Sequence, residues 1–158
     1  MITIIVAIAE NGAIGYKNEL LYRISADLKR FKALTTGHTI VMGRKTFQSL
    51  PKGALPNRRN IVLTRDSSIQ FEGAETFTSI DSVLTSVRED EQLFIIGGAE
   101  IYKQTMAIAD KLEVTLVHDV PSEADAYFPE ITDEWKEVNR EDFNSEDSPA
   151  YSFITYSR

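Results

Sequence analysis

The sequence predicts a single α/β domain over residues 1–158, with a central, mostly parallel eight-stranded sheet, about four flanking helices and a C-terminal antiparallel strand pair. Three observations lead to this prediction. Segments that are nearly all apolar, at 2–8 and 93–96, are typical of strands buried on both faces. Segments with helical periodicity alternate with the predicted strands. The last two predicted strands follow each other without a helix between them, which favours antiparallel pairing.

The chain begins with a predicted strand at Met1–Ala9, followed by a loop over residues 10–23. This loop is long for a connection between a strand and a helix, and it contains the turn signal Asn11-Gly12. Long glycine-containing loops after central strands are often lids over binding sites. From the sequence alone, a plain surface loop is an equally good interpretation.

A helix is predicted to begin after Ser25, a favourable N-cap residue. At about 100° per residue, its apolar stripe contains Ile24, Leu28, Phe31 and Leu34. Asp27 falls inside this stripe, where a carboxylate is costly unless a polar group meets it. Asp27 could simply interact with the helix dipole and the free N–H groups of the first turn. Taken alone, the sequence favours that interpretation over a buried acid that binds a ligand.

The remaining elements follow from the same signals. Strands are predicted at 39–42, 60–64, 75–77, 93–96 and 112–118, with the closing antiparallel pair at 135–143 and 151–157. Helices are predicted from residue 44, after the cap residue Ser79, and over 99–109. An irregular basic loop lies at 51–59.

Composition makes several kinds of site improbable. The chain has no cysteine, which removes disulfides and thiolate chemistry and fits a reducing compartment. His38 and His118 are the only histidines, so a histidine-based metal site or a serine triad has little support and no metal is expected. No apolar run approaches the length of a membrane span, and no charged leader precedes the first strand. We therefore expect a cytoplasmic protein without a membrane partner, and a monomer because no extended apolar surface pattern is evident.

The net charge of −7 argues against binding to nucleic acid. This charge is unevenly distributed. Residues 1–65 contain eleven Lys or Arg and three Asp or Glu, a net charge of +8, and residues 66–158 contain six and twenty-one, a net charge of −15. A solvated acidic C-terminal part would explain the difference. The alternative is that the first part of the chain binds an anionic small molecule.

Three predicted strand ends carry residues suited to phosphate. Gly43-Arg44-Lys45-Thr46 opens a helix, Thr64-Arg65 closes a strand, and Gly97-Gly98 lies between a strand and a helix. Open α/β sheets bind ligands beyond the C-terminal ends of their strands. Helix N-termini favour phosphates, and glycine allows close approach of the backbone. Each junction alone is an ordinary turn or basic patch, but three at one sheet edge indicate a dinucleotide or similar polyphosphate. The G-x-G-x-x-G fingerprint is absent, so the binding mode would not be that of the Rossmann fold.

Several motifs, in their order and spacing, together resemble the bacterial dihydrofolate reductase family over essentially the whole chain. These motifs are Ile14-Gly15, Ala26-Asp27-Leu28 with Phe31, Val41-Met42-Gly43-Arg44-Lys45-Thr46, Leu55-Pro56 with Arg58 and Asn60-Ile61-Val62-Leu63-Thr64, Ile95-Ile96-Gly97-Gly98-Ala99-Glu100-Ile101-Tyr102, and Tyr127-Phe128-Pro129. The resemblance implies reduction of 7,8-dihydrofolate to tetrahydrofolate in one-carbon metabolism, with hydride from NADPH to C6 and a proton to N5. It also implies a target of antifolates.

The same resemblance implies a substrate site. Asp27 would accept hydrogen bonds from the 2-amino group and N3 of the pterin, a charge-assisted arrangement that explains an acid on an apolar stripe. Thr115 would support that edge of the pterin, and Arg58 would bind the α-carboxylate of the glutamate tail with Lys32 adding charge. The walls of the substrate site would be Ile5, Val6, Leu28, Phe31, Leu50, Leu55, Ile96 and Tyr102.

The cofactor site implied by the resemblance spans the three strand ends. Gly97-Gly98 would carry a cis peptide and receive the pyrophosphate. The adenosine end, with its 2′-phosphate, would be held by Arg44, Lys45, Thr46, Thr64 and Arg65, and the nicotinamide would be surrounded by Ala7, Ile14 and Tyr102. Other residues that would contact the cofactor are Gly15, Asn18, Leu20, Gly43, Leu63, Ile96, Ala99, Glu100 and Ile101. Residues 14–24 would form a lid that excludes water, with Leu20 at its tip.

One departure from the family pattern concerns the lid. Leu21-Tyr22 stands where the family usually has Pro-Trp, so the resemblance implies that the Tyr22 hydroxyl takes the place of an indole that donates through a water near the pterin. Two other functions remain as alternatives. One is a reductase of related fold that acts on another heterocycle, such as the pyrimidine of riboflavin synthesis. The other is a non-catalytic nucleotide-binding module, which would need neither Asp27 on an apolar face nor a lid.

Overall fold

The computed structural model describes residues 1–66, 68–146 and 148–158. Its main feature is an eight-stranded sheet with the strand order β10-β11-β8-β1-β7-β4-β5-β6. The strands are β1 (Ile2–Ala9), β4 (Thr39–Gly43), β5 (Arg59–Leu63), β6 (Ala74–Phe77), β7 (Leu93–Gly97), β8 (Lys111–Val117), β10 (Lys136–Phe143) and β11 (Tyr151–Ser157). The first six of these pair in parallel, and β11 pairs antiparallel with both β8 and β10. The predicted sheet and its closing antiparallel pair are confirmed.

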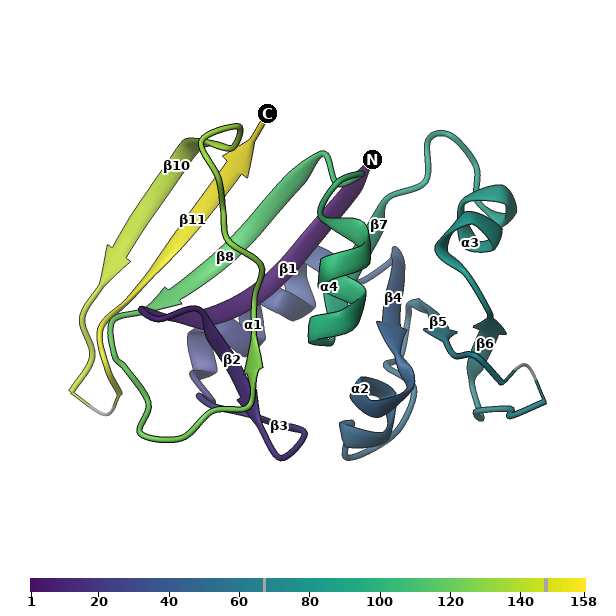
Figure 1. Ribbon diagram of the computed structural model, residues 1–158, viewed down its shortest axis with the longest axis horizontal. Helices are drawn as coiled ribbons and strands as arrows, with labels where there is room; N and C mark the ends of the chain where they lie inside the picture. The colour runs from purple at the N-terminus through teal and green to yellow at the C-terminus, as the bar shows by residue number, and fades with distance from the viewer. Residues whose placement is uncertain (67, 147) are drawn as a thin grey trace.

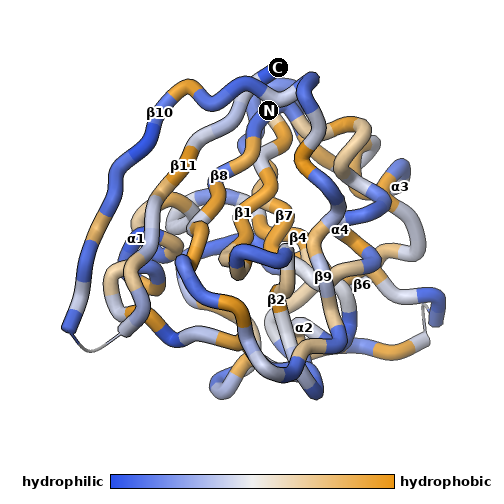
Figure 2. The backbone as a smooth tube through the Cα atoms, turned by 60° about the vertical axis from the view of Figure 1, so that its left-hand side comes forward, coloured by the Kyte–Doolittle hydropathy of each residue, from blue (hydrophilic) through white to orange (hydrophobic). Residues whose placement is uncertain are grey.

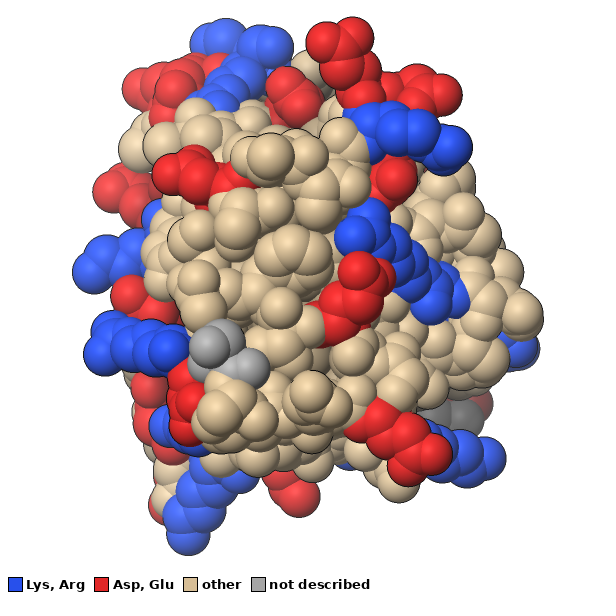
Figure 3. Space-filling model, turned by 90° about the vertical axis from the view of Figure 1, so that its right-hand side faces the viewer, with Lys and Arg blue, Asp and Glu red and all other residues tan. Residues whose placement is uncertain are grey.

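The buried centre of the sheet is apolar, as the continuous apolar runs predicted. Figure 2 shows hydrophobic residues along β1, β7 and β8, whereas β10 at one edge of the sheet is largely hydrophilic. Seven of the eight residues of β10 are exposed, so this edge strand presents polar side chains to solvent, which discourages edge-to-edge pairing with other chains. On the face beyond the opposite edge, which carries β6 and α3 (Ile80–Ser86), acidic and basic side chains are interspersed around uncharged surface (Figure 3).

Two helices pack on each face of the sheet. On one face α3 and α4 (Ala99–Thr105) contribute Val83 and Ile101 to the largest apolar cluster. On the other face α1 (Ser25–Thr35) and α2 (Arg44–Ser49) contribute Leu34 and Phe47 to a second cluster. Figure 1 shows α4 in front of the sheet and α1 behind it. Within the described residues, no helix is long and apolar enough to span a bilayer.

The long loop after β1 contains structure that the sequence did not reveal. Its residues form β2 (Ala13–Tyr16) and β3 (Glu19–Leu20), which join the distant β9 (Ala126–Tyr127) in a three-stranded sheet. The backbone N–H of Lys17 also donates to the Asp125 carboxylate over 3.0 Å. Because these strands are only two to four residues long and pair across the chain, local periodicity carries little signal for them.

Two predicted helix ends were wrong. Ser25 is the first residue of α1 rather than its cap, and the N-cap position is Ile24, which makes no side-chain cap hydrogen bond. The last predicted helix was expected to reach residue 109 but ends at Thr105. There the N–H groups of Ile108 and Ala109 both donate to the Thr105 carbonyl, so the regular helical pattern stops. The predicted cap Ser79 is confirmed, since its hydroxyl accepts from the Ser82 N–H over 3.1 Å.

Candidate active site

Two adjoining cavities lie where β1 and β7 approach their C-terminal ends. The first has a volume of about 690 Å³ and the second about 520 Å³. Both are lined by Val6 and Ala7 of β1, by Ile96 of β7 and by Leu20 of the lid, so they form one continuous cleft. Open α/β sheets bind ligands at this end of their strands. The parallel topology therefore places the cleft where the sequence predicted a site.

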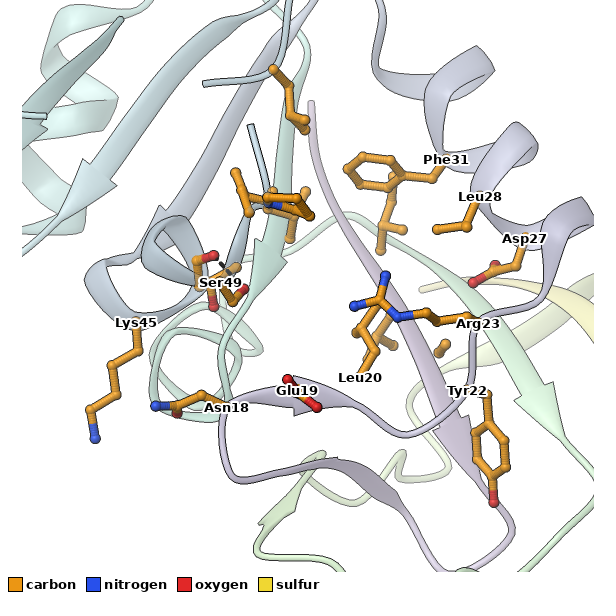
Figure 4. Close-up of a pocket in the computed structure, with 18 of the residues that line it drawn as sticks. Asn18, Glu19, Leu20, Tyr22, Arg23, Asp27, Leu28, Phe31, Lys45 and Ser49 are labelled. Carbon is orange, nitrogen blue, oxygen red and sulfur yellow. Dashed lines mark hydrogen bonds between the residues drawn. The ribbon is translucent and has the colours of Figure 1, made fainter. Parts of the chain in front are cut away.

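Asp27 projects from α1 into the first cavity (Figure 4). Its carboxylate accepts a hydrogen bond of 2.5 Å from the hydroxyl of the buried Thr115 on β8. Burial raises the pKa of Asp27, and the Thr115 hydrogen bond and the positive charge of Arg30 act in the opposite direction. In the described part of the chain, Thr115 is the only side chain that hydrogen-bonds this carboxylate. The other carboxylate oxygen is therefore free for a ligand.

The apolar stripe of α1 divides between the protein core and the cleft. Ile24 and Leu34 pack in core clusters. Leu28 and Phe31 instead point into the first cavity beside Asp27 (Figure 4), and Leu28 is 45% exposed. A stripe that looked like a core face is thus partly a binding face. The remaining walls of this cavity include Ile5, Leu50, Leu55 and Tyr102.

A second polar end of the first cavity is formed by Arg58. Its guanidinium donates to Thr35 Oγ1 over 3.1 Å and to the Pro56 carbonyl over 2.9 Å, which fixes its orientation. Burial lowers the pKa of Arg58. No carboxylate in the described ranges pairs with this cation, and Lys32 lines the same cavity. The cavity therefore has an acid on one wall and unpaired positive charge on another, which suits an elongated ligand with an anionic end.

Three side chains of the predicted lid, residues 14–24, lie near the first cavity and point in different directions. Leu20 and Arg23 face the cavity, whereas the Tyr22 hydroxyl points away from Asp27 (Figure 4). That hydroxyl donates to the Asp119 carboxylate over 2.8 Å. Desolvation, with the hydrogen bond to Asp119 and its negative charge, raises the pKa of Tyr22 to about 12. In this conformation the Tyr22 hydroxyl is engaged outside the cavity.

The second cavity follows the backbone between β7 and α4. Its lining includes Gly97, Gly98, Ala99 and Glu100, opposite Ile14, Gly15 and Asn18 of the lid and Lys45 and Thr46 of α2. The predicted cis peptide between Gly97 and Gly98 is confirmed. A side chain on either glycine would place its Cβ 3.3 Å from Thr46 Oγ1, so glycine is what lets these segments approach each other.

Comparison with known proteins agrees with this arrangement. A family model described as dihydrofolate reductase matches residues 1–158. The dihydrofolate reductase of Neisseria meningitidis serogroup A is 43% identical over 99% of this chain and 98% of its own length, and that of Bacillus subtilis is 38% identical over 100% and 95%. The chain belongs to the dihydrofolate reductase family.

A solved structure of this family has the same fold. It is described as dihydrofolate reductase from Enterococcus faecalis complexed with NADP(H) and RAB-propyl, and it matches with a TM-score of 0.92 and 33% identity. The match covers 100% of this chain and 96% of the other. A dihydrofolate reductase fold thus extends over the whole chain, including the lid.

Most residues that the family resemblance implied are brought together in the cleft, and some are not. Those that line neither cavity are Gly43, Arg44, Leu63, Thr64, Arg65, Ile101 and Thr115. Thr115 reaches the site through Asp27. Leu63 and Ile101 are buried in the core, and Arg44 and Arg65 are exposed. For these residues a role in binding stays a prediction.

Several residues that line the cleft were not named individually from the sequence. Four of them lie within the predicted lid, namely Tyr16, Lys17, Glu19 and Arg23, and those that were missed altogether are Gln48, Ser49, Pro51, Asp125 and Ala126. Ser49 was accessible to prediction, because it follows Lys45 by four residues and so shares a face of α2. Asp125 was not, because the pairing of β2 with β9 that brings it to the lid has no local signal.

Proposed function

We propose that this protein reduces 7,8-dihydrofolate to 5,6,7,8-tetrahydrofolate with NADPH, by hydride transfer to C6 and protonation of N5, and so feeds one-carbon metabolism. The observation that carries this proposal is Asp27, an acid on an apolar wall that has one hydrogen-bonding side chain among the residues the structure describes. Neither a related reductase for a riboflavin-pathway pyrimidine nor a non-catalytic nucleotide module is favoured, since membership of the dihydrofolate reductase family supports neither.

In the proposed substrate complex, Asp27 orients the pterin. Its free oxygen and the oxygen already held by Thr115 accept from two N–H groups on one edge of the ring. Leu28 and Phe31 contact the ring and side chain of the substrate, and Arg58 with Lys32 binds the terminal carboxylates. The apolar surroundings strengthen these contacts because they exclude water. Orientation of this kind is a main contribution of a protein whose cofactor supplies the reactive group.

The second cavity fits the proposed cofactor. Its lining includes Gly97 and Gly98, where no side chain keeps a ligand from the backbone, and a cation, Lys45, which suits the pyrophosphate of a dinucleotide. When bound, NADPH supplies the hydride. Ala7, Ile14 and Tyr102 would contact its nicotinamide, and Arg44, Thr64 and Arg65 would extend the site to the 2′-phosphate.

The lid would complete the site by excluding water. Leu20 lies on the walls of both cavities, so closure there would cover the reacting atoms. Because the Tyr22 hydroxyl bonds Asp119, we propose that it delivers a proton through water only if the lid rearranges. We also propose a cytoplasmic monomer acting as one domain, a target for antifolates, with no nucleic-acid or membrane partner.

The test is consumption of NADPH by the purified protein with dihydrofolate as substrate. We expect oxidation of NADPH that depends on dihydrofolate and yields tetrahydrofolate. Binding of NADPH without oxidation by any pterin would favour the nucleotide-binding module. Oxidation with a riboflavin-pathway pyrimidine, and none with dihydrofolate, would favour the related reductase.

A further inference from the structure

Beneath the active-site helix lies a buried charge cluster that the proposed reaction does not use. Its centre is Glu113 of β8, whose side chain is 6% exposed. One Glu113 oxygen is bound by the guanidinium of Arg30 and accepts from the Thr155 hydroxyl over 2.9 Å. The other oxygen lies 3.3 Å from Lys111 Nζ. Removing a carboxylate from water is costly, so this acid requires its three partners.

The register of the sheet explains how this cluster relates to Asp27. Glu113 is paired with Thr155 of β11, and Thr115 is paired with Phe153, so the four side chains share one face of the strand pair. We call these four residues the platform. Arg30 contacts two of them, since its guanidinium binds Glu113 and lies 4.7 Å above the ring centre of Phe153. Asp27 contacts a third member, Thr115, whose hydroxyl donates to the Asp27 carboxylate.

The helix is therefore fixed to the platform at two points. Asp27 and Arg30 are three residues apart and lie on the same side of α1. Their partners Thr115 and Glu113 are two residues apart and lie on the same side of β8. Two polar contacts at different heights add to the core packing of Ile24 and Leu34, and together they restrict rotation and sliding of the helix. The aim of the Asp27 carboxylate thus depends on the second contact.

We propose that Arg30, held by Glu113 and Phe153, is a positioning residue that sets the aim and the charge state of Asp27 for the pterin. This inference rests on the proposed function, and Arg30 itself lines neither cavity. It acts through geometry, because it fixes the helix, and through charge, because it lies one helical turn from Asp27. Glu113 and Lys111 are part of the same device, since they balance the arginine.

Other charged groups around Asp27 come from three directions. Arg23 of the lid and Lys32 and Arg58 line the same cavity. The hydroxyl of Tyr102 on α4 is buried and donates to the Ile5 carbonyl. Burial, together with the negative charge of Asp27, raises the pKa of Tyr102, so this side chain stays neutral. Among the described charged residues, Arg30 is the one whose positive charge lowers the pKa of Asp27. It opposes the effect of burial together with Thr115.

The test compares Arg30→Met and Glu113→Gln. Arg30→Met removes a positive charge, so the pKa of Asp27 should rise. Glu113→Gln removes a negative charge, so the same pKa should fall. Both variants weaken the second contact, so both should raise KM for dihydrofolate about tenfold, the order expected for one misaligned charge-assisted hydrogen bond. A purely structural loosening of α1 would move the Asp27 titration in the same direction in both variants.

Asp27 is followed by NMR in ligand-free protein with labelled aspartate, assigned with Asp27→Asn, so this readout does not need turnover. Arg30→Lys keeps the positive charge, so the Asp27 titration should stay near its wild-type position and KM for dihydrofolate should rise less than in Arg30→Met. Arg59→Met is the matched control, because Arg59 pairs with Glu75 and Glu91 away from the cleft. It should lower the melting temperature and change neither readout.

The outcomes separate this inference from the proposed function. If Arg30→Met does not fold, because Glu113 then lacks its main partner, Arg30→Met/Glu113→Gln removes both charges. That double variant should raise KM and leave the Asp27 titration near its original position. Titrations that do not move in opposite directions, or an unchanged KM for dihydrofolate in folded variants, would overturn the role of Arg30. A wild-type protein without dihydrofolate turnover would refute the proposed function, and the NMR titrations would still decide the electrostatic role of Arg30.

Discussion

Replacing Asp27 by asparagine should separate binding of the cofactor from reduction of the substrate. The substitution preserves the shape of the side chain, and the Thr115 hydroxyl can still donate to the amide oxygen. It removes the negative charge and turns the free oxygen into an N–H donor that faces the N–H group of the pterin. Asp27 lines only the first cavity, so the walls proposed for NADPH remain unchanged.

The expected loss of turnover can be bounded from these contacts. A hydrogen bond to a charged group contributes about 1.5–3 kcal/mol, which corresponds to roughly 10- to 150-fold. Positioned acid–base groups contribute about 10²–10⁴-fold in enzymes generally. We therefore expect kcat/KM near neutral pH to fall by about 10²–10⁴-fold. Activity should partly return as the pH falls, because acid protonates the substrate before hydride transfer.

Asp27→Asn should lower turnover, but it should not lower the free energy of unfolding at neutral pH. Burial raises the pKa of Asp27 above its unfolded value, so the folded protein holds the proton more tightly than the unfolded chain. At neutral pH the ionised Asp27 therefore destabilises the fold, and this penalty disappears as the pH falls through the folded pKa. Asp27→Asn should be at least as stable as the wild type at pH 7. The assays are NADPH oxidation from acid to neutral pH, NADPH binding by fluorescence, and thermal unfolding. Wild-type turnover by Asp27→Asn at neutral pH would refute the role of this carboxylate.

Three further substitutions test other parts of the site. Arg65→Ala should narrow the preference for NADPH over NADH, because the exposed arginine is proposed to bind the 2′-phosphate. An equal increase in KM for NADPH and for NADH would contradict this. Tyr22→Phe should abolish the titration near pH 12, seen as phenolate absorbance, and the stability from its bond to Asp119. The stability that the Tyr22–Asp119 hydrogen bond contributes is complete below pH 10 and disappears as the pH rises through about 12. If the wild type and Tyr22→Phe still had unequal melting temperatures at pH 12 and above, this contribution of the hydrogen bond would be refuted. Thr115→Val should raise the pKa of Asp27 and KM for dihydrofolate, and an unmoved NMR titration of Asp27 would show that the hydroxyl is dispensable.

The sequence predicted the sheet and most of the cleft because both depend on local patterns. Apolar runs located β1, β7 and β8, and parallel topology alone then places residues that follow strands at one edge. The motifs of the family resemblance named most residues of both cavities. What could not be predicted depends on pairing between distant segments. The bond from Tyr22 to Asp119 spans 97 positions, and the sheet that joins the lid to β9 has strands too short to show periodicity.

The start of α1 was predicted incorrectly for an instructive reason. Ser25 has the chemistry of a cap, but Ile24 occupies that position and packs against Val117 and Tyr151 instead. Burial of the Ile24 side chain in this apolar cluster thus fixes where the helix enters. Cap preferences are worth about 1 kcal/mol, and burial of an isoleucine is worth more. Tertiary packing therefore outweighs the local signal at this end of the helix.

A comparison of Glu113, which belongs to the platform, with Asp27, which contacts it, shows why the composition of a helix stripe is an incomplete guide to function. Glu113 is buried and Asp27 is half-buried, and Glu113 has Arg30, Lys111 and Thr155 as partners. Within the described ranges, Asp27 has Thr115 as its single hydrogen-bonding side chain, and burial raises its pKa. The protein has enough positive charge nearby to neutralise both acids, yet the geometry directs it to Glu113. An acid that the fold leaves incompletely satisfied, on the wall of a cavity, retains the capacity to bind a ligand that donates two hydrogen bonds. The distinction between the two acids comes from the register of β8 against β11 and from the three-residue spacing on α1, and neither is visible in the stripe itself.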